Sequence, residues 1–263
     1  MTGTQSISKK IVEALPPDTV HLNTPVVSID DSGISITVIT SKRTFTAKHA
    51  ILTIPSLLYK TLLISPPLPP LKEELVNSTI HGHLSKVFLS FEQPWWRGLG
   101  CCGLTQSLHP ESLIAVTRDT SNDSVGSYTL LGFIAGDAGR AWAAKDPSAR
   151  REAVISHFQT LFCELLPAGQ TMPEPTGYIE QLWWNEPYSQ GCPCPALPPS
   201  VMTTLRADAT KVLRMRHGRL HFAGTEMASV WRGYMDGAVR SGEEAAREVL
   251  PELRFGAGDG AKL

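Results

Sequence analysis

The alternation of apolar and polar positions divides the chain into segments of different secondary structure. Apolar residues recur at helical spacing over residues 7–15 and stop at a Pro-Pro pair, which predicts a short helix at the start. Three β-rich runs follow, at residues 20–29, 34–40 and 45–54. A turn at residues 30–33 joins the first two runs as a hairpin. The third run ends in an apolar stretch at 50–55, which predicts a strand covered on both faces.

A proline-rich stretch at residues 65–70 breaks regular structure and predicts the crossing into a second region. The elements expected there are a helix at 71–78, a strand at 84–91, a helix at 148–166 and a strand at 177–184. A last strand at 219–223 enters a glycine turn and a helix that ends near residue 250. This order predicts an α/β plus α+β fold. A mixed-sheet domain at 65–186 would be inserted into an α/β domain formed by 1–64 and 187–250, with a flexible tail at 251–263.

Composition and charge exclude some classes of partner. The 263 residues carry 24 Lys and Arg against 25 Asp and Glu, and the net charge of -1 argues against nucleic acid. No apolar stretch reaches the roughly 18–20 residues that a membrane helix needs, so we expect no membrane partner. Five Cys, an odd number in a long chain, do not indicate a disulfide framework. The cysteines and histidines lack metal-ligand spacing, and we expect His81 and His83 to be solvated.

The strongest local pattern lies near the end of the chain. A short strand runs into Gly224-Thr225-Glu226, and a second glycine turn, Gly233-Tyr234, opens a helix with small residues along one side. Small side chains let a helix approach a strand or a flat ligand closely, and a helix N-terminus offers free N–H groups. From the residues alone, a ligand cradle and a well-packed terminal helix are equal alternatives.

This segment resembles the C-terminal flavin-binding signature of the flavin monoamine oxidase family, which also includes polyamine oxidases. Further segments resemble the same family in the same order: GTQSISKKIVEAL with VHLNTPVVSID, AKHAILTIP, LSKVFLSFEQPWW and LWWNEPYSQGC. The resemblance covers nearly the whole chain. It implies a partial FAD-binding, Rossmann-like domain at 1–64 and 187–250, with the inserted domain at 65–186 binding the substrate.

One unit of the family pattern is absent from the sequence. Members of the family begin with a strand, a GxGxxG turn and a helix, which hold the FAD pyrophosphate, and no such fingerprint occurs here. The resemblance therefore implies the C-terminal half of an amine oxidase in truncated form. A second chain could supply the missing FAD lobe.

The resemblance implies two catalytic residues. Lys86 matches the lysine that holds a water against flavin N5, and strand alternation places it on the face of Leu84 and Phe88. The alternative is a lysine that extends from an edge strand into solvent. Tyr234 matches one wall of the aromatic cage that orients a neutral amine. At the position of the second wall this chain has Pro193, so the cage is incomplete or built otherwise.

Several other residues match cofactor contacts of the family. They are Val26 at the adenine half, Trp183 beside the flavin ring, Cys192 at the flavin 8α-methyl group, Gly224, Thr225 and Glu226 along the pyrophosphate and ribityl chain, and Met235 at the pyrimidine edge. For Trp183 the alternative is ordinary core packing. For Cys192 the resemblance allows a covalent thioether to FAD, and the alternative is an unreacted thiol in a loop.

The implied function is an FAD-dependent oxidation of a small-molecule amine to an imine, which hydrolyses to an aldehyde, with oxygen reduced to hydrogen peroxide. One alternative is a catalytically inactive remnant or interaction subunit that lacks its own FAD. Another is an oxidase of polyamines or of a biosynthetic intermediate. The last residues, Ala261-Lys262-Leu263, resemble a peroxisomal import signal, so we expect a peroxisomal location, with the cytoplasm as the alternative.

Overall fold

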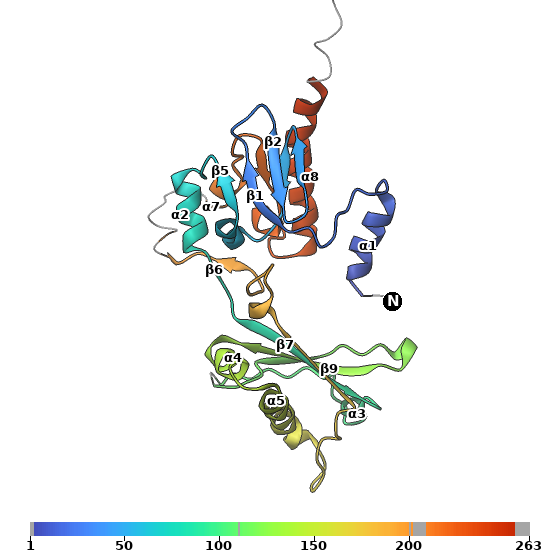
Figure 1. Cartoon of the computed structure of the whole chain (residues 1–263). Coiled ribbons are helices and arrows are strands. Elements are labelled where there is room, and N and C mark those ends of the chain that lie inside the picture. The colour runs from blue at the N-terminus through green and yellow to red at the C-terminus, as the bar shows by residue number, and fades with distance from the viewer. Residues whose placement is uncertain (1–2, 110, 200, 202–208, 256–263) are drawn as a thin grey trace, which may run out of the picture.

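Two lobes, each with its own hydrophobic core, make up this computed structural model, which describes residues 3–109, 111–199, 201 and 209–255. The upper lobe in Figure 1 contains the first strands of the chain and its last helix, whereas the lower lobe contains the middle of the chain. Sheets and helices are combined in both lobes. The predicted α/β plus α+β class is therefore confirmed.

A four-stranded sheet forms one side of the upper lobe, in the order β3-β2-β1-β5. Its strands are β1 (Val26–Asp30), β2 (Ile36–Thr40), β3 (Thr44–Ala47) and β5 (Leu63–Ser65). The antiparallel pair β1 and β2 confirms the predicted hairpin, and Ile29 and Ile36 point from it into the core. β5 pairs in parallel with β1 at the other edge.

A second sheet of two strands pairs β4 (Ala50–Leu52) in parallel with β12 (Leu220–Phe222). The third β-rich run is therefore divided into two strands, of which β3 belongs to the first sheet and β4 to the second. Ile51 is 41% exposed, so β4 is covered on one face only and the prediction of two covered faces is wrong. Within the part of the chain that the structure describes, no third strand joins this pair.

Helices and 3-10 turns complete the upper lobe. They are η1 (Ser56–Thr61), α2 (Pro70–Ser78), α7 (Ala209–Arg214), η5 (Thr225–Met227) and α8 (Met235–Phe255). Leu75 and Val76 of α2 share one core with Phe222 of β12 and Met227 of η5. The predicted domain boundary at residue 65 is therefore too early, because the apolar side of α2 packs on the upper lobe.

The lower lobe is built on an antiparallel sheet in the order β10-β7-β9-β8. Its elements are β7 (Leu84–Phe91), α3 (Trp95–Gly98), β8 (Val116–Asp119), η2 (Asp123–Val125), β9 (Tyr128–Ala135), α4 (Gly136–Ala143), α5 (Pro147–Phe162), η3 (Cys163–Leu165) and β10 (Gly177–Leu182). Val87 and Leu89 of β7 are fully buried in the core that includes Phe158 of α5. Because side chains alternate along a strand, Lys86 lies on the face of β7 turned away from that core.

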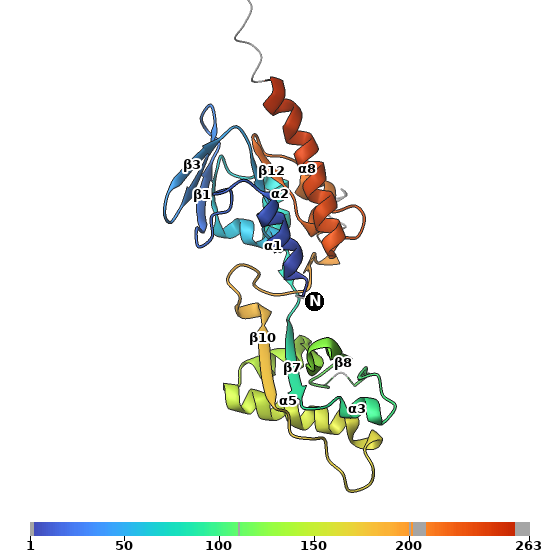
Figure 2. The same cartoon turned by 90° about the vertical axis from the view of Figure 1, so that its right-hand side faces the viewer.

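Two crossings of the chain connect the lobes. β6 (Ile80–His81) leads from the upper lobe into β7, and β10 leads back through η4 (Trp183–Asn185) to β11 (Pro195–Ala196). β6 and β11 pair antiparallel, so the two crossings lie side by side (Figures 1 and 2).

The first helix, α1 (Gln5–Ala14), confirms the helix predicted over residues 7–15, but none of its residues is buried. It lies beside the upper lobe (Figure 1). The apolar residues that give the helix its pattern are between 41% and 55% exposed: Ile7, Ile11, Val12 and Leu15. α1 therefore exposes an apolar side, as β4 exposes one of its faces.

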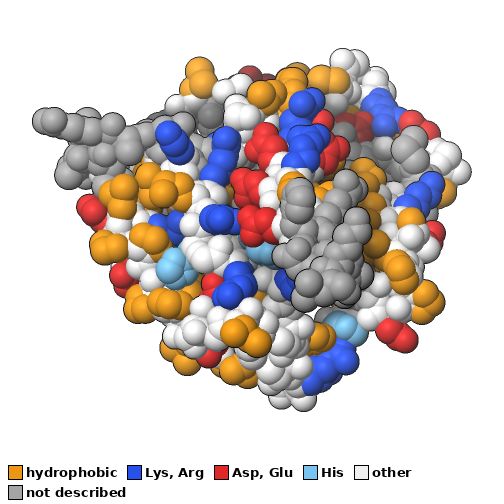
Figure 3. Space-filling view, turned by 90° about the horizontal axis from the view of Figure 1, so that it is seen from above, with side chains coloured by type: hydrophobic (Ala, Val, Ile, Leu, Met, Phe, Trp, Pro, Cys, Tyr) orange, Lys and Arg blue, Asp and Glu red, His pale blue; other side chains and the backbone are white. Residues whose placement is uncertain are grey.

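The last helix, α8, runs past Pro251 to Phe255, so residues 251–255 are helical where the sequence predicted the start of a tail. Residues 256–263, and with them Ala261-Lys262-Leu263, lie outside the described residues. Figure 3 views the upper lobe from the end at which α8 leaves it and shows acidic and basic side chains interleaved on that surface. Over the described ranges, none of the helices combines the length and apolar character needed to span a bilayer.

A buried lysine joins two helices of the upper lobe. Lys72 of α2 is 1% exposed, and its Nζ donates hydrogen bonds to the carbonyl oxygens of Leu213, at 2.8 Å, and Met215. The same Nζ lies 3.4 Å from the ring centroid of Phe222. These contacts place a cation where the last carbonyl groups of α7 need donors. Burial nevertheless lowers the pKa of Lys72 to about 7.

This burial predicts a pH dependence of folding. Lys72 is a much stronger base in the unfolded chain, so above about pH 7 the unfolded state binds more protons than the folded state. The free energy of unfolding should therefore rise from pH 7 to pH 9, by up to about 1.4 kcal/mol per pH unit from this group. Urea unfolding at several pH values should show that Lys72→Met removes this rise and that exposed Lys42→Met does not. An equal rise in Lys72→Met and the wild type would contradict the assignment.

Candidate functional site

A cavity of about 440 Å³ lies where η5 of the upper lobe, β7 of the lower lobe and the connection from η4 to β11 meet. Five residues predicted from the sequence line it together: Lys86, Trp183, Cys192, Thr225 and Glu226. Its other lining residues are Pro55, His81, Leu84, Phe133, Ser189, Gly191, Pro193 and Pro195. The walls are thus mainly apolar, with a few polar side chains among them, as in many ligand sites.

Lys86 brings a positive charge to this cavity. The register of the sheet places it opposite Phe133 of β9, and its Nζ lies 5.7 Å from the centroid of that ring. Among the described residues, no carboxylate forms an ion pair with Lys86. The ammonium group is therefore available to a bound molecule or to water.

The positive charge of Lys86 affects the pKa of the Cys192 thiol. Burial raises the pKa of the Cys192 thiol, and the Lys86 ammonium group opposes this effect. The Sγ atom donates a weak hydrogen bond to the carbonyl oxygen of Leu84 at 3.5 Å. Cys192 is therefore a half-buried, protonated thiol at the wall of the cavity.

The loop that carries Cys192 is fixed by its backbone. The N–H of Cys192 donates to the carbonyl oxygen of Gly82 at 3.1 Å, and the N–H of Gly191 donates to that of Trp183 at 3.0 Å. Gly191 has a φ of 129°, and a Cβ atom there would lie 2.5 Å from the Cβ of His81. Only glycine fits this close approach of the two crossings.

Trp183 presents an unused hydrogen-bond donor. Its Nε1 atom is buried and has no partner, although buried polar groups in proteins are nearly always paired. Because the side chain lines the cavity, a ligand with an acceptor atom could complete it. This orphaned donor, the free ammonium group of Lys86 and the apolar walls fit a flat heteroaromatic ring of the flavin type.

The glycine turn after β12 is held by its own side chains. The N–H of Gly224 donates to Ser241 Oγ at 3.1 Å, and the N–H of Gly233 donates to Thr225 Oγ1 at 2.7 Å. Thr225 Oγ1 in turn donates to the carbonyl oxygen of Tyr234 at 2.9 Å. The Thr225 hydroxyl therefore holds the two glycine turns together, and its predicted contact with the ribityl chain stays a prediction.

Glu226 is buried at the junction of η5 and η1. Its carboxylate accepts hydrogen bonds from the backbone N–H of Ser56, at 3.1 Å, and from Ser56 Oγ. The carboxylate thus satisfies the first N–H of η1. Glu226 also lines the cavity, but these contacts assign it first to holding the upper lobe together, and its predicted contact with FAD stays a prediction.

Four predicted residues lie outside the lining of this cavity: Gly224, Tyr234, Met235 and Val26. Tyr234 is 65% exposed, and its ring packs edge-on against Trp231 with centroids 5.7 Å apart. Met235 and Val26 are also exposed. The structure therefore brings Lys86 and Trp183 into one cavity without Tyr234, and the roles of Gly224, Tyr234, Met235 and Val26 stay predictions.

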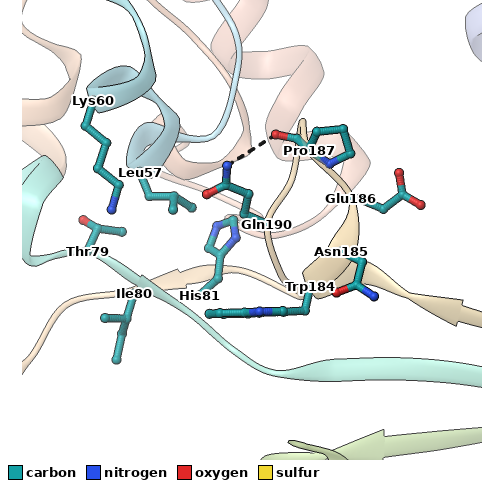
Figure 4. A pocket seen from close by; sticks show the side chains of 10 residues that line it. All are labelled: Leu57, Lys60, Thr79, Ile80, His81, Trp184, Asn185, Glu186, Pro187 and Gln190. Carbon is teal, nitrogen blue, oxygen red and sulfur yellow. Dashed lines mark hydrogen bonds between the residues drawn. The ribbon is translucent and has the colours of Figure 1, made fainter. Parts of the chain in front are cut away.

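A second cavity, also of about 440 Å³, shares His81 with the first cavity and is drawn in Figure 4. His81 and Trp184 both point into it, and Gln190 lies beside them. The prediction that His81 and His83 are solvated is wrong. His83 is 9% exposed, and both ring nitrogens of His81 are buried without a hydrogen-bond partner. Burial lowers the pKa of His81, while the negative charge of Glu226 opposes this shift.

The sequence reasoning missed His81 and Phe133 as lining residues. The signal that pointed to His81 is Gly82 beside it, where a Cβ atom would lie 2.7 Å from the carbonyl oxygen of Cys192. Gly82 between two histidines is thus a sequence feature from which this close crossing of the backbone could have been suspected. Phe133 had no such signal, because only the pairing of β7 with β9 brings it to Lys86. Over the described ranges, His, Cys, Asp and Glu form no group of three or more suited to a metal ion.

Comparison with known proteins assigns a family to this geometry. Residues 1–250 match the family model described as flavin containing amine oxidoreductase. Curated relatives include the flavin-containing amine oxidase B of Sus scrofa, 34% identical over 249 residues, which are 94% of this chain and 46% of the relative. An L-amino acid dehydrogenase of Synechocystis sp. is 32% identical over 250 residues, 94% of this chain and 50% of the relative.

Solved structures agree with this result. Wild-type putrescine oxidase bound to putrescine superposes with a TM-score of 0.83 at 26% identity, covering 95% of this chain and 53% of that one. Cyclohexylamine oxidase from Brevibacterium oxydans gives a TM-score of 0.82 at 26% identity, covering 95% and 52%. The chain spans about half the length of these relatives.

The electrostatic effect of Lys86 on Cys192 predicts a change in thiol reactivity. Removing the charge in Lys86→Met should raise the pKa of Cys192 further and slow its alkylation by iodoacetamide at pH 8, by about twofold to fivefold. Mass spectrometry of the modified peptides gives the rate, with the exposed Cys102 as internal reference and Lys145→Met as control variant. An unchanged Cys192 rate in Lys86→Met would show that the ammonium group does not act on this thiol.

Proposed function

Since this chain belongs to the flavin containing amine oxidoreductase family, we propose that it forms the amine-binding side of an FAD-dependent oxidase that converts a small amine to an imine or aldehyde with release of hydrogen peroxide. The observation that carries this proposal is the gathering of Lys86, Trp183 and Cys192 in one mainly apolar cavity. A bound flavin supplies the two-electron oxidation of the amine.

The residues around the cavity would hold the flavin from several sides. Trp183 Nε1 would donate a hydrogen bond to it, since this donor has no partner within the protein. Cys192 lies in the same wall, and covalent attachment of FAD through its thiol is the finer form of the proposal. Gly224, whose φ of 132° favours glycine, leaves the turn after β12 without a side chain.

The remaining side chains would select and orient the amine. The free ammonium group of Lys86 repels a second cation, so the amine would bind in its neutral form. Leu84, Phe133 and Pro193 would contact its carbon skeleton and exclude water. Lys86 would hold a water molecule through its remaining N–H donors and pass protons to and from it.

The class of amine is a second part of the proposal. Putrescine oxidase and cyclohexylamine oxidase share this fold, and one of their structures contains putrescine. We therefore include diamines among the candidate substrates. The exposed Tyr234 and the presence of Pro193 in the cavity leave room for a longer or bulkier amine than an aromatic cage would accept.

An interaction subunit is the alternative function, and a specific observation favours it. The apolar side of α1, the outer face of β4, and Trp231, Met235 and Val239 around the start of α8 are all exposed. Surfaces of this kind mark protein contacts. We propose that they pack against an FAD lobe of the GxGxxG type, which a second chain would supply.

Trp183 should contribute directly to flavin binding. Trp183→Phe keeps the ring but removes the unpaired donor, so FAD should bind about fivefold more weakly, the value of one hydrogen bond. Quenching of flavin fluorescence measures the affinity. The matched control is Trp184→Phe, because Trp184 lines the other cavity and should leave the affinity unchanged. Equal effects of the two variants would remove Trp183 from the flavin site.

Lys86 should control turnover rather than folding. With FAD and a neutral amine such as cyclohexylamine, Lys86→Met should lower the rate of amine-dependent peroxide formation by about tenfold or more, whereas Lys145→Met should not. Peroxide is measured by a coupled peroxidase assay, with this chain alone and with a second polypeptide that carries a GxGxxG lobe.

Flavin that stays with the protein after acid precipitation, and is lost in Cys192→Ala, would support the covalent link. Absence of peroxide in both mixtures would leave the interaction subunit as the function.

A further inference from the structure

Another cavity, of about 390 Å³, lies in the lower lobe, at the end of β7 opposite to the crossings. One wall contains Phe91, the last residue of β7, together with Glu92 and with Trp95 at the start of α3. The other wall is the segment that leads into β10 and includes Glu174. This cavity shares no lining residue with the cavity of Lys86. It is therefore a separate candidate site.

Contacts within the protein fix both walls of this cavity. The N–H of Thr176 donates to the carbonyl oxygen of Ser90 at 2.8 Å, and Thr176 Oγ1 donates to the same oxygen at 3.2 Å. On the other side, the N–H of Trp95 donates to the carbonyl oxygen of Gln93 at 2.9 Å. The Trp95 ring packs edge-on against Phe91, with centroids 5.8 Å apart. The cavity is thus formed before a ligand binds, which lowers the cost of binding.

The cavity carries negative charge that the protein does not neutralise. Its lining includes the carboxylates of Glu92 and Glu174 but no Lys, Arg or His. Within the part of the chain that the structure describes, neither carboxylate forms an ion pair. The nearby Arg97 is already engaged by Asp119, at 2.8 Å, and by Asp123. Two carboxylates beside two aromatic rings favour an organic cation.

Trp95 supplies a second, independent observation. Its Nε1 atom is buried and has no hydrogen-bond partner, whereas Nε1 of the neighbouring Trp96 donates to Asp119 Oδ2 at 2.9 Å. Buried donors in proteins are nearly always paired. Because Trp95 lines the cavity, an oxygen acceptor on a bound molecule could complete this donor. The cavity therefore suits a ligand that combines a positive charge, an apolar body and an oxygen acceptor.

We propose that this cavity binds an organic ammonium ion that carries a hydroxyl group, of the aromatic amino alcohol class. The ammonium group pairs with Glu92 and Glu174, and the apolar body packs on Phe91 and Trp95, where a cation–π contact adds to the attraction. The hydroxyl oxygen accepts the free N–H of Trp95. The preference for a cation is the opposite of that expected beside Lys86, so the two cavities differ in the charge of the molecule they accept.

A first test follows the indole N–H signals of the whole chain in ¹H–¹⁵N NMR spectra, without flavin, so that its result is independent of oxidase activity. Phenylethanolamine, a cation at neutral pH, should move the Trp95 signal to saturation and leave that of Trp142, buried in the core, in place. Phenylethylene glycol has a hydroxyl group instead of the ammonium group and should bind about fivefold more weakly or less. Equal affinity of the two probes, or an unmoved Trp95 signal, would overturn the proposal.

A second test measures the affinity for phenylethanolamine by calorimetry in variants of the whole chain. Glu92→Gln and Glu174→Gln should each weaken binding by about threefold, whereas Glu152→Gln, on α5 and outside the cavity, should not. Trp95→Phe keeps a ring but removes the donor, so it should weaken phenylethanolamine more than phenethylamine, which lacks the hydroxyl group. Unchanged affinity in both Glu92→Gln and Glu174→Gln, or an equal loss in Glu152→Gln, would overturn the proposal.

Discussion

The close approach of two backbone segments, at Gly82 and at Gly191, is the constraint on which the cavity depends. A side chain on either glycine would collide with the other crossing, at 2.7 Å from the carbonyl oxygen of Cys192 or 2.5 Å from the Cβ of His81. The hydrogen bond from Cys192 to Gly82 forms only at this distance. It sets the connection from η4 to β11 against the start of β7, and so places Trp183 and Cys192 opposite Lys86.

The same constraint leaves polar groups unsatisfied. His81 is enclosed by the loop, and both its ring nitrogens lack partners, as does Nε1 of Trp183. Orphaned polar atoms are costly in a protein interior, and in native structures they gather where a ligand completes them. Glu226 shows the opposite case, because its buried carboxylate is satisfied by Ser56 within the protein. The cavity wall therefore contains a buried carboxylate that is paired within the protein and buried ring nitrogens that have no partner.

Much of the fold could be predicted from the sequence, because local pattern determined it. The strand at 84–91 matches β7, and the hairpin at β1 and β2 follows from its turn residues. The position of α2 could not be predicted in this way, because Leu75 and Val76 are apolar whichever lobe they join.

The candidate site was predictable to a smaller extent. Lys86, Trp183 and Cys192 were found by resemblance, whereas Phe133 enters through strand pairing. Tyr234 was predicted as one wall of an aromatic cage; its ring packs edge-on against Trp231 and is 65% exposed, and the cage stays a prediction. Side-chain direction at the start of a helix depends on what covers it, and local sequence does not contain that information.

The lobes are joined by two neighbouring crossings, β6 to β7 and β10 to β11, and these crossings are bonded to each other. Neither can bend alone, so a rotation of one lobe against the other would have to turn about this paired segment as a single hinge. Because the segment also forms a wall of the cavity, the width of the cavity would change whenever the angle between the lobes changes. A molecule that fills the cavity would thereby fix the orientation of one lobe relative to the other.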